Sequence, residues 1–366
     1  MNHQPVARDN FEIAIVTSLP LEYNAASYIF DEFWDGFANT VEGDSNYYTH
    51  GRIGKYNVVL ILLPGIGKVH AASSTATLNM SYRNLRLAFL IGICGGVPFT
   101  HKQTNGVLLG DVIIGSSIVQ FDLGREYPTR FLRKDSSLDN MGRLSKDLRT
   151  TLRFFETDRG LAQLREKVAI YLGHIQRAHS MRCQGRSCER YNYPGTSEDK
   201  LFEATYHHRH RGSGTCCSET STCELAYLAS CKDVGCDESH LLPRKLLDVK
   251  RTMEEQNPKE AGIPTIHIGP IASGDTVMRC GEARDRIARI EEILAFEMEA
   301  AGVWGEIPSL VVKGVSDYAD SHKQKRWQDY AAATAAATLR ALLGLVQLHG
   351  KSQISWSILP KCYLLK

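Results

Sequence analysis

Acidic side chains follow two apolar segments in the last quarter of the chain. Glu297 and Glu299 lie within FEMEAAG, and a buried carboxylate is costly unless it is bonded to a partner. Asp317 and Asp320 follow a second apolar run in KGVSDYADSH. At neighbouring strand ends, two acids could divide the work, one holding substrate hydroxyls and the other donating a proton. Acids exposed at a helix start are the alternative, and these residues alone favour neither.

A third acid, Glu22, follows an early apolar run in TSLPLE. Pro20 suits the first turn of a helix, so Glu22 could project from a helix start into a cleft. The commoner situation is an acid that the helix dipole favours and that has no chemical role.

Two glycine-rich segments also follow apolar runs, PGIGKVHAA at 64–72 and IGICGGV at 91–97. Glycine permits a close approach of the backbone to a ligand, and free N–H groups at a helix start can bind an anion or hydroxyls. Neither segment has the G-x-x-x-x-G-K-[ST] spacing of a nucleotide phosphate loop. A tight turn without a ligand explains either segment equally well.

Short runs rich in Val and Ile predict the strands that position these residues. Near-continuous apolar strands are typical of a sheet buried on both faces, so we expect an α/β sandwich. The predicted strands begin at Glu12, Asn57, Leu87, Val107, Thr265, Leu294 and Ser309. The predicted helices cover 21–33, 67–83, 283–292 and the alanine-rich 327–348.

The 366 residues, 43% hydrophobic and 23% charged, are typical of a folded globular protein. A net charge of +2 gives no electrostatic reason to expect a nucleic acid or a membrane surface as partner. The first residues lack the pattern of a secretory signal, and no apolar run is long enough to span a bilayer. We therefore expect a cytoplasmic protein.

The strand signal fades between about residues 121 and 263, where Arg, His, Cys, Ser and Gly become frequent. We expect a long insertion at 122–262 with polar helices near 145–155 and 161–175 and a loop-rich stretch at 179–250. It interrupts a domain at 11–349, and 350–366 forms a peripheral tail.

The order of GIGKV, GICGG, ASGD, FEMEAAG and GVSDYADS resembles the nucleoside phosphorylase and nucleosidase superfamily. The methylthioadenosine/S-adenosylhomocysteine nucleosidase branch and fungal purine nucleosidase-like domains are the most similar. The resemblance covers 12–119 and 264–345, and QFDLGREYP resembles the fungal branch alone. It implies a three-layer α/β/α sandwich with a central mixed sheet and a homodimer or higher homo-oligomer.

By this resemblance, Asp317 is the general acid that protonates the purine N7, and Glu22 positions the attacking water. Glu299 binds the ribose hydroxyls and Met298 packs against the sugar. Protonating the base makes it a better leaving group when the N-glycosidic bond breaks. The other candidate substrate-binding residues are Glu297, Gly95, Gly96, Ser273, Val277, Lys313, Gly67, Phe121 and Arg125.

The resemblance also bears on whether water or phosphate is the attacking group. Bacterial hexameric phosphorylases hold phosphate with an arginine in an RVGSCG-like strand, and this chain has Leu90 there. Lys313 stands where bacterial nucleosidases usually carry arginine. We expect a purine nucleosidase that releases adenine by hydrolysis without a cofactor. A phosphate-dependent purine nucleoside phosphorylase and a non-catalytic nucleotide sensor are the alternatives.

The insertion is rich in basic side chains: Arg125, Lys200, His207, His208, Arg209, His210 and Arg211. They could grip the phosphates of a nucleotide, and fungal relatives include nucleosidases that accept ATP, so we favour ATP over methylthioadenosine. A solvated run of charge is the commoner situation.

Five cysteines follow HHRH within the insertion, at 216, 217, 223, 231 and 236. Zinc could use His207, His210, Cys216 and Cys223, but the usual C-x-x-C pair is absent. We therefore expect free thiols and no bound metal.

Overall fold

The structure is a computed structural model that describes residues 7–35, 41–99, 106–135, 141, 143–183, 189–211, 216–218, 222–322 and 325–346. The predicted tail at 350–366 lies outside these residues.

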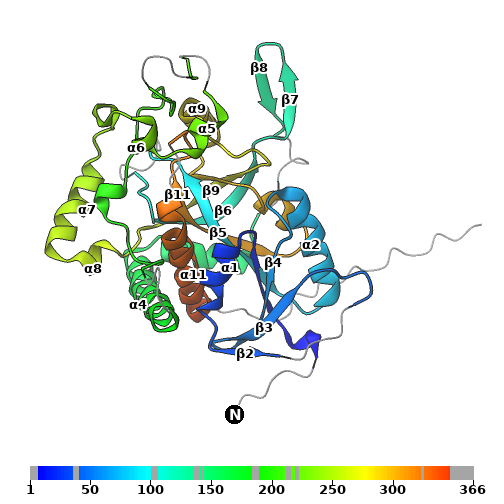
Figure 1. Ribbon diagram of the computed structural model, residues 1–366. Helices are drawn as coiled ribbons and strands as arrows, with labels where there is room; N and C mark the ends of the chain where they lie inside the picture. Colours follow the sequence, from blue (N-terminus) through cyan, green and yellow to red (C-terminus); the bar gives the residue numbers. More distant parts are fainter. Residues whose placement is uncertain are drawn as a thin grey trace, which may run out of the picture.

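A nine-stranded mixed sheet forms the centre of the molecule, with the order β10-β9-β6-β11-β5-β1-β4-β3-β2 (Figure 1). β5 runs parallel to both β1 and β11, while β6 is antiparallel to β11. Its strands are β1 Ile13–Thr17, β2 Glu32–Trp34, β3 Tyr48–Ile53, β4 Tyr56–Leu62, β5 Leu87–Gly96, β6 Val112–Gln120, β9 Ile266–Ser273, β10 Ala295–Glu297 and β11 Ser309–Asp317.

Helices flank this sheet, which confirms the expected α/β/α sandwich. α1 and α11 pack on each other and on β1, β5 and β11, while α2 packs against α10. The helices outside the insertion are α1 Pro20–Ser27, α2 Lys68–Ser81, α9 Gly281–Glu291, α10 Ala300–Val303 and α11 Gln328–Leu345.

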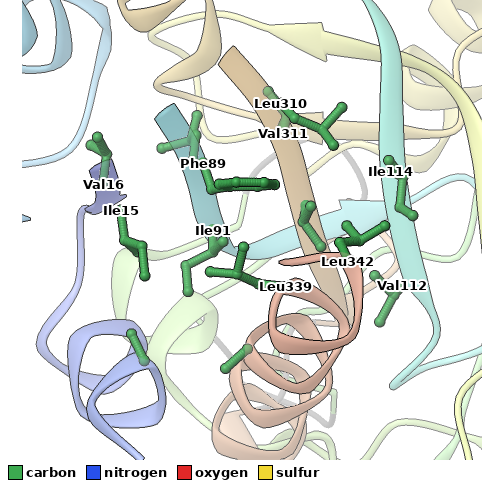
Figure 2. Packing of buried hydrophobic residues seen from close by; sticks show 14 of the residues in the cluster. Ile15, Val16, Phe89, Ile91, Val112, Ile114, Leu310, Val311, Leu339 and Leu342 are labelled. Atoms are coloured by element: carbon green, nitrogen blue, oxygen red, sulfur yellow. The ribbon is translucent and has the colours of Figure 1, made fainter. Parts of the chain in front are cut away.

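The largest apolar core lies between the sheet and α11 (Figure 2). Ile91 on β5 and Val112 on β6 are fully or almost fully buried and face Leu339 and Leu342 of α11. Alanines cover most of the buried surface of α11, and their small side chains allow the helix to approach the strands closely. Burial of apolar surface stabilises the folded state by about 25 cal/mol per Å² removed from water. This core therefore supports the sheet.

The sheet curls so that β10 reaches β5 as well as β9. Phe296 pairs with Ala272 of β9 on one side and with Gly95 of β5 on the other. This curl brings the end of β10 next to the ends of β5 and β11, where the acidic and glycine-rich sequences lie. The fold therefore gathers segments that are about 200 residues apart in the chain.

The insertion contains more regular structure than the sequence predicts. The expected loop-rich stretch at 179–250 is wrong at both ends, because α4 continues to Arg182 and α7 begins at Lys245. A hairpin of β7 and β8 extends from the body of the protein (Figure 1). The helices and named strands of the insertion are β7 Gly124–Tyr127, β8 Arg130–Arg133, α3 Lys146–Phe155, α4 Asp158–Arg182, α5 Glu224–Leu228, α6 Cys231–Val234, α7 Lys245–Gln256 and α8 Pro258–Ala261.

Two further expectations are corrected. The predicted helix at 21–33 ends at Ser27, and Glu32–Trp34 instead forms β2, which pairs with β3 through Phe33 and Gly51. Cys183 is disulfide-bonded, although free thiols were expected in the insertion. None of the helices in the described ranges combines the length and apolar character that crossing a membrane requires.

Candidate active site

A cavity of about 250 Å³ lies where the ends of β5, β10 and β11 meet. Three acids from different parts of the chain line it: Glu22 from α1, Glu299 from the start of α10 and Asp317 from the end of β11. The other lining residues are Ser18, Leu19, Ile66, Ile93, Cys94, Gly95, Thr276, Val277, Met278, Arg279, Phe296, Glu297, Met298, Ser316, Ala319 and Gln328.

A β-bulge at the end of β11 positions Asp317. The register against β5 shifts between Val315 and Asp317, so that Asp317 pairs with Gly95. Such bulges change the direction in which a side chain points. The Asp317 carboxylate accepts hydrogen bonds from the Ala319 N–H at 2.9 Å and from the Ser316 hydroxyl at 3.1 Å. Ala319 has a φ of 53°, an uncommon backbone conformation for a residue with a side chain, next to this acid.

Glu22 is held in a fixed orientation by backbone donors around it. Its Oε2 accepts from the N–H groups of Ser18 and Leu19, both at 2.9 Å, and its Oε1 accepts from the Ile93 N–H at 2.8 Å. A Cβ on Gly92 would lie 2.1 Å from the same Oε1, so this position needs glycine. Burial raises the pKa of Glu22, although the Lys313 ammonium group opposes that shift.

A buried lysine lies between the two acids of FEMEAAG. Lys313 Nζ is 3.1 Å from Glu299 Oε2 and 3.4 Å from Glu297 Oε2. Burial alone would lower the pKa of Lys313, but Glu299, Glu297 and Glu22 outweigh it and raise that pKa. Burial also raises the pKa of Glu297. Lys313 therefore remains a cation that offsets part of the negative charge of this cavity wall.

Backbone donors fix the two acids further. The Glu297 carboxylate accepts from the N–H groups of Glu299 and Ala300, both at 3.0 Å. The N–H of Gly67 lies 3.3 Å from Glu299 Oε1, and the φ of 106° at Gly67 favours glycine. Glu299 can thus present its carboxylate to hydroxyl groups without reorienting.

Apolar side chains also line the cavity. Val277, Met278, Phe296 and Ile66 can pack on a flat ring. Phe121 meets Phe296 edge to face, with ring centroids 5.5 Å apart, and so supports one of these side chains. The cavity therefore combines carboxylates that can bind a polyhydroxyl group with apolar side chains that can contact an aromatic base.

Of the residues expected at the site, Asp317, Glu22, Glu299, Glu297, Met298, Gly95 and Val277 line this cavity together. Gly67, Lys313, Phe121 and Ser273 lie one layer behind it. Ser273 accepts a hydrogen bond from the Ala301 N–H at 3.0 Å and so positions the start of α10. The lining excludes Gly96, where a Cβ would meet Val315, and Arg125, which lies exposed on the β7–β8 hairpin.

Sequence reasoning missed three lining residues outside the segments that it singled out: Met278, Arg279 and Gln328. Met278 and Arg279 directly follow Val277, so extending that segment would have found them. Gln328 begins α11, and no local pattern connects it with the strand ends. Leu90 is fully buried inside β5 and pairs with Val16 and Val311, so it does not reach the cavity.

The insertion contacts the segment that follows Asp317. Tyr318 Oη donates a hydrogen bond to Asp199 Oδ1 at 2.7 Å, and Arg244 is 2.8 Å from the same oxygen. The three side chains are buried. Asp199 and Arg244, both within the insertion, therefore hold the residue next to the candidate general acid.

Most of the basic side chains of the insertion are engaged locally. Lys200 pairs with Glu238, His207 lies 3.6 Å from Glu282, and the Arg211 guanidinium lies 4.0 Å from the centre of the Tyr206 ring. In the described residues, thiols and imidazoles come together in two groups, and His207 belongs to neither. His210, Cys216 and Cys223 come together with Cys217, while His208 joins Cys231, Cys236 and His322.

Comparisons with known proteins agree with this architecture. The S. pneumoniae 5′-methylthioadenosine/S-adenosylhomocysteine nucleosidase has a similar structure, with a TM-score of 0.50 and 19% identity over 91% of this chain and 98% of that one. The futalosine hydrolase of Helicobacter pylori strain 26695 matches at a TM-score of 0.46 and 13% identity, covering 92% and 98% of the two chains. The likeness to the S. pneumoniae enzyme shows a shared fold.

At the level of sequence, the chain is 27% identical over 347 residues to a nucleotide-binding leucine-rich repeat-like protein of Hyaloscypha variabilis. That match covers 93% of this chain but 30% of the relative, so the chain corresponds to one part of a much longer protein. The sequence profile of the Phosphorylase superfamily matches residues 12–236. This chain therefore belongs to the Phosphorylase superfamily.

Proposed function

We propose that this chain is a purine nucleosidase that hydrolyses the N-glycosidic bond of an adenine nucleoside or nucleotide. The observation that carries the proposal is that Glu22, Glu299 and Asp317 line one small cavity together with apolar side chains. The apolar side chains suit a purine ring, and the carboxylates suit the sugar hydroxyls and a proton donor to the base.

Asp317 is proposed to protonate the purine N7 as the bond from the sugar to N9 breaks. The departing base gains electron density and the sugar gains positive charge, so a proton donor at the base lowers the barrier. The carboxylates of Glu299 and Glu22 would stabilise the developing positive charge on the sugar. Their fixed hydrogen bonds mean that little reorganisation is needed in the transition state.

Water is favoured over phosphate as the attacking group. A phosphate dianion would enter a cavity lined by Glu22 and Glu299, whose negative charges repel it. Lys313 lies behind the lining and is already paired with two carboxylates, which leaves it poorly placed to hold phosphate. Arg279 is the single lysine or arginine among the lining residues.

We favour ATP over methylthioadenosine as the substrate, with its phosphates directed towards solvent. Arg279 lines the cavity and remains exposed. Arg125 lies on the exposed hairpin that follows β6. These arginines replace the ion-paired Lys200 and His207 as the candidates for phosphate contacts.

A substrate panel tests the activity. Adenosine, inosine, methylthioadenosine, AMP and ATP would be incubated with the protein, with and without phosphate, and the released base measured by chromatography. We expect adenine from ATP at a rate that does not depend on phosphate. Strict dependence on phosphate would replace hydrolysis by phosphorolysis.

A second candidate function is a non-catalytic nucleotide sensor. The similarity to part of a nucleotide-binding leucine-rich repeat-like protein favours it, because a domain of such a protein could report binding to the rest of the chain. Calorimetric binding of ATP with no base released, alongside an active bacterial nucleosidase as control, would support the sensor over the enzyme.

The expected domain at 11–349 with its insertion, the homo-oligomer and the cytoplasmic location also remain proposals. Light scattering coupled to gel filtration measures the oligomeric state directly. A mass equal to that of one 40.8 kDa chain would contradict the expected dimer.

A further inference from the structure

Two groups of cysteine and histidine side chains converge outside the proposed catalytic machinery. The inner cluster consists of His208, Cys231, Cys236 and His322, and the outer cluster consists of His210, Cys216, Cys217 and Cys223. Within each cluster, one candidate ligand atom from every residue lies within 4.8 Å of the others. Each cluster thus offers four nitrogen or sulfur atoms around one point.

The spacing of the inner cluster fits a tetrahedral metal ion. The four distances from Sγ of a cysteine to Nδ1 of a histidine are 3.4, 3.6, 3.6 and 3.7 Å. With zinc–sulfur bonds of about 2.3 Å and zinc–nitrogen bonds of about 2.0–2.1 Å, a tetrahedron places sulfur and nitrogen about 3.6 Å apart. The thiols and imidazoles therefore already have the separations that zinc requires.

The second nitrogen of each inner histidine has a partner that fixes the ring. His208 Nε2 lies 3.1 Å from the Ala229 carbonyl, and His322 Nε2 lies 2.7 Å from the Tyr206 carbonyl. A carbonyl oxygen can only accept a hydrogen bond, so each Nε2 carries the proton and donates, and each Nδ1 keeps a lone pair directed at the thiols. Metal-binding histidines are oriented in this way by hydrogen bonds from their other nitrogen.

The outer cluster repeats the pattern with three thiols. Nδ1 of His210 is 3.4 Å from the sulfurs of Cys216 and Cys223 and 3.7 Å from that of Cys217. The backbone N–H of Cys223 lies 3.4 Å from the sulfur of Cys217, a contact that stabilises a thiolate. This cluster is more exposed than the inner one.

The two short helices next to the cysteines bury few side chains of their own. α5 and α6 contain five and four residues, and each buries a single side chain, Ala226 and Val234 respectively. Helices this short are not stable alone. Small segments without an adequate apolar core are commonly stabilised by a structural metal.

We propose that each cluster binds one Zn²⁺ ion, as a closed four-ligand structural site. The inner site has the Cys₂His₂ set and the outer site the Cys₃His set, both usual for structural zinc. The inner ion joins the insertion to His322, which lies five residues after Asp317 and outside the insertion. This inference does not depend on the proposed activity.

The metal content of the full chain tests the proposal. The protein would be expressed with added zinc, purified without chelator or metal-affinity resin under reducing conditions, and analysed by inductively coupled plasma mass spectrometry. We expect two zinc ions per chain, one for each cluster. Less than about half an ion per chain would overturn the proposal, as would non-reducing mass spectra showing the clustered cysteines joined as disulfides.

Paired variants assign the ions to the clusters. Cys216→Ser with Cys223→Ser, and separately Cys231→Ser with Cys236→Ser, should each lose one ion. Cys280→Ser, an exposed thiol outside both clusters, should keep two. A pair of substitutions that leaves the zinc content unchanged overturns the site at that cluster.

Cobalt exchange covers the case in which the inner variant does not fold. Wild-type protein exchanged with Co²⁺ should show the visible absorption of tetrahedral thiolate-bound cobalt. About half of it should be lost in the outer variant, whose exposed position leaves the circular dichroism spectrum intact. Octahedral cobalt spectra in the wild-type protein would contradict both sites.

Discussion

The strand-end cavity and the two Cys/His clusters both gather polar side chains from distant parts of the chain, but by different means. At the cavity, a curled sheet with a large apolar core presents Glu22, Glu299 and Asp317 at strand and helix ends. At the clusters, short helices and irregular segments converge on thiols and imidazoles. Apolar burial positions the first group, whereas the polar groups themselves hold the second together.

This difference predicts where each region is sensitive. The cavity should tolerate the loss of one acid without unfolding, because the sheet behind it is stabilised independently. The clusters should lose their bound metal when a pair of ligands is lost, while the sheet stays folded. The cysteine pairs described above test the clusters, and the variants below test the cavity and its supports, from the largest expected effect to the smallest.

Replacing Asp317 by Asn should lower kcat by about 10²–10⁴, the range typical of losing a general acid. The melting temperature should change little, because an amide oxygen can still accept from the Ala319 N–H. Asp147→Asn, an exposed acid on α3, serves as the control. Unchanged base release by the Asp317 variant would remove it from the chemistry.

Lys313→Met should destabilise the protein by about 3–5 kcal/mol, the usual cost of leaving a buried partner charge unpaired. Glu297 and Glu299 would lose the cation that lies 3.4 and 3.1 Å away. Urea denaturation measures the change. Lys313→Arg should recover much of the loss, and a neutral effect in Lys313→Met would show that the two acids are protonated in the native state.

Tyr318→Phe should destabilise the protein by about 1–3 kcal/mol, because the buried Asp199 loses a hydrogen-bond donor. This variant probes the contact between the insertion and the segment carrying Asp317. Denaturation and turnover should be measured together. If stability falls while kcat is fully retained, the insertion supports the fold without orienting Asp317.

Activity should fall at acidic pH, and the pKa of Glu22 should set where the fall begins. Burial raises the pKa of this carboxyl above its usual 4.5, so its ionised form is lost at a higher pH than that of a free glutamate. If Glu22 must be ionised to position water, kcat/KM falls about tenfold per pH unit below that raised pKa. A limb that persists unchanged in Glu22→Gln would assign it to another group.

The same carboxyl makes stability depend on pH in the opposite direction to activity. Its raised pKa stabilises the folded state below pH 4.5, and this contribution is lost as the pH rises through the raised value. Glu297 behaves in the same way. Denaturation at several pH values then separates lost catalysis from unfolding.

Arg279→Ala should produce the smallest effect, a several-fold loss of kcat/KM for ATP with little change for adenosine. Arg279 lines the cavity and is exposed, so solvent screens its attraction for phosphate. Arg125→Ala provides a comparison from the hairpin outside the lining. Equal losses for ATP and adenosine would assign Arg279 to the base or sugar instead.

The sequence predicted the cavity better than the insertion for a physical reason. Runs such as those that became β5 and β11 are mostly apolar and buried, and the ends of parallel neighbouring strands meet at one edge of a sheet. No local pattern reveals the curl that pairs Phe296 with Gly95, because it depends on strands distant in the chain. The roles of the acids came from the resemblance, since spacing alone left them open.

The sequence predicted the structure of the insertion less well, because the residues that come together there are far apart in the chain. His322 completes a cluster whose other members lie about 90 to 110 residues earlier, and sequence spacing cannot show this. His207 was a candidate ligand because it is next to His208, but its side chain points towards Glu282. Extended helices such as α4 were found, yet their ends were not, because helix ends depend on caps and packing.

The short segment from Tyr318 to His322 has a consequence for engineering. Tyr318, at its start, donates a hydrogen bond to Asp199, which also pairs with Arg244. His322, at its end, lies among Cys231, Cys236 and His208. A trimmed version of the domain, cut back to the sheet and its flanking helices, would discard nearly all of those anchors. Shortening this protein to a minimal scaffold would thus release the loop next to the proposed general acid.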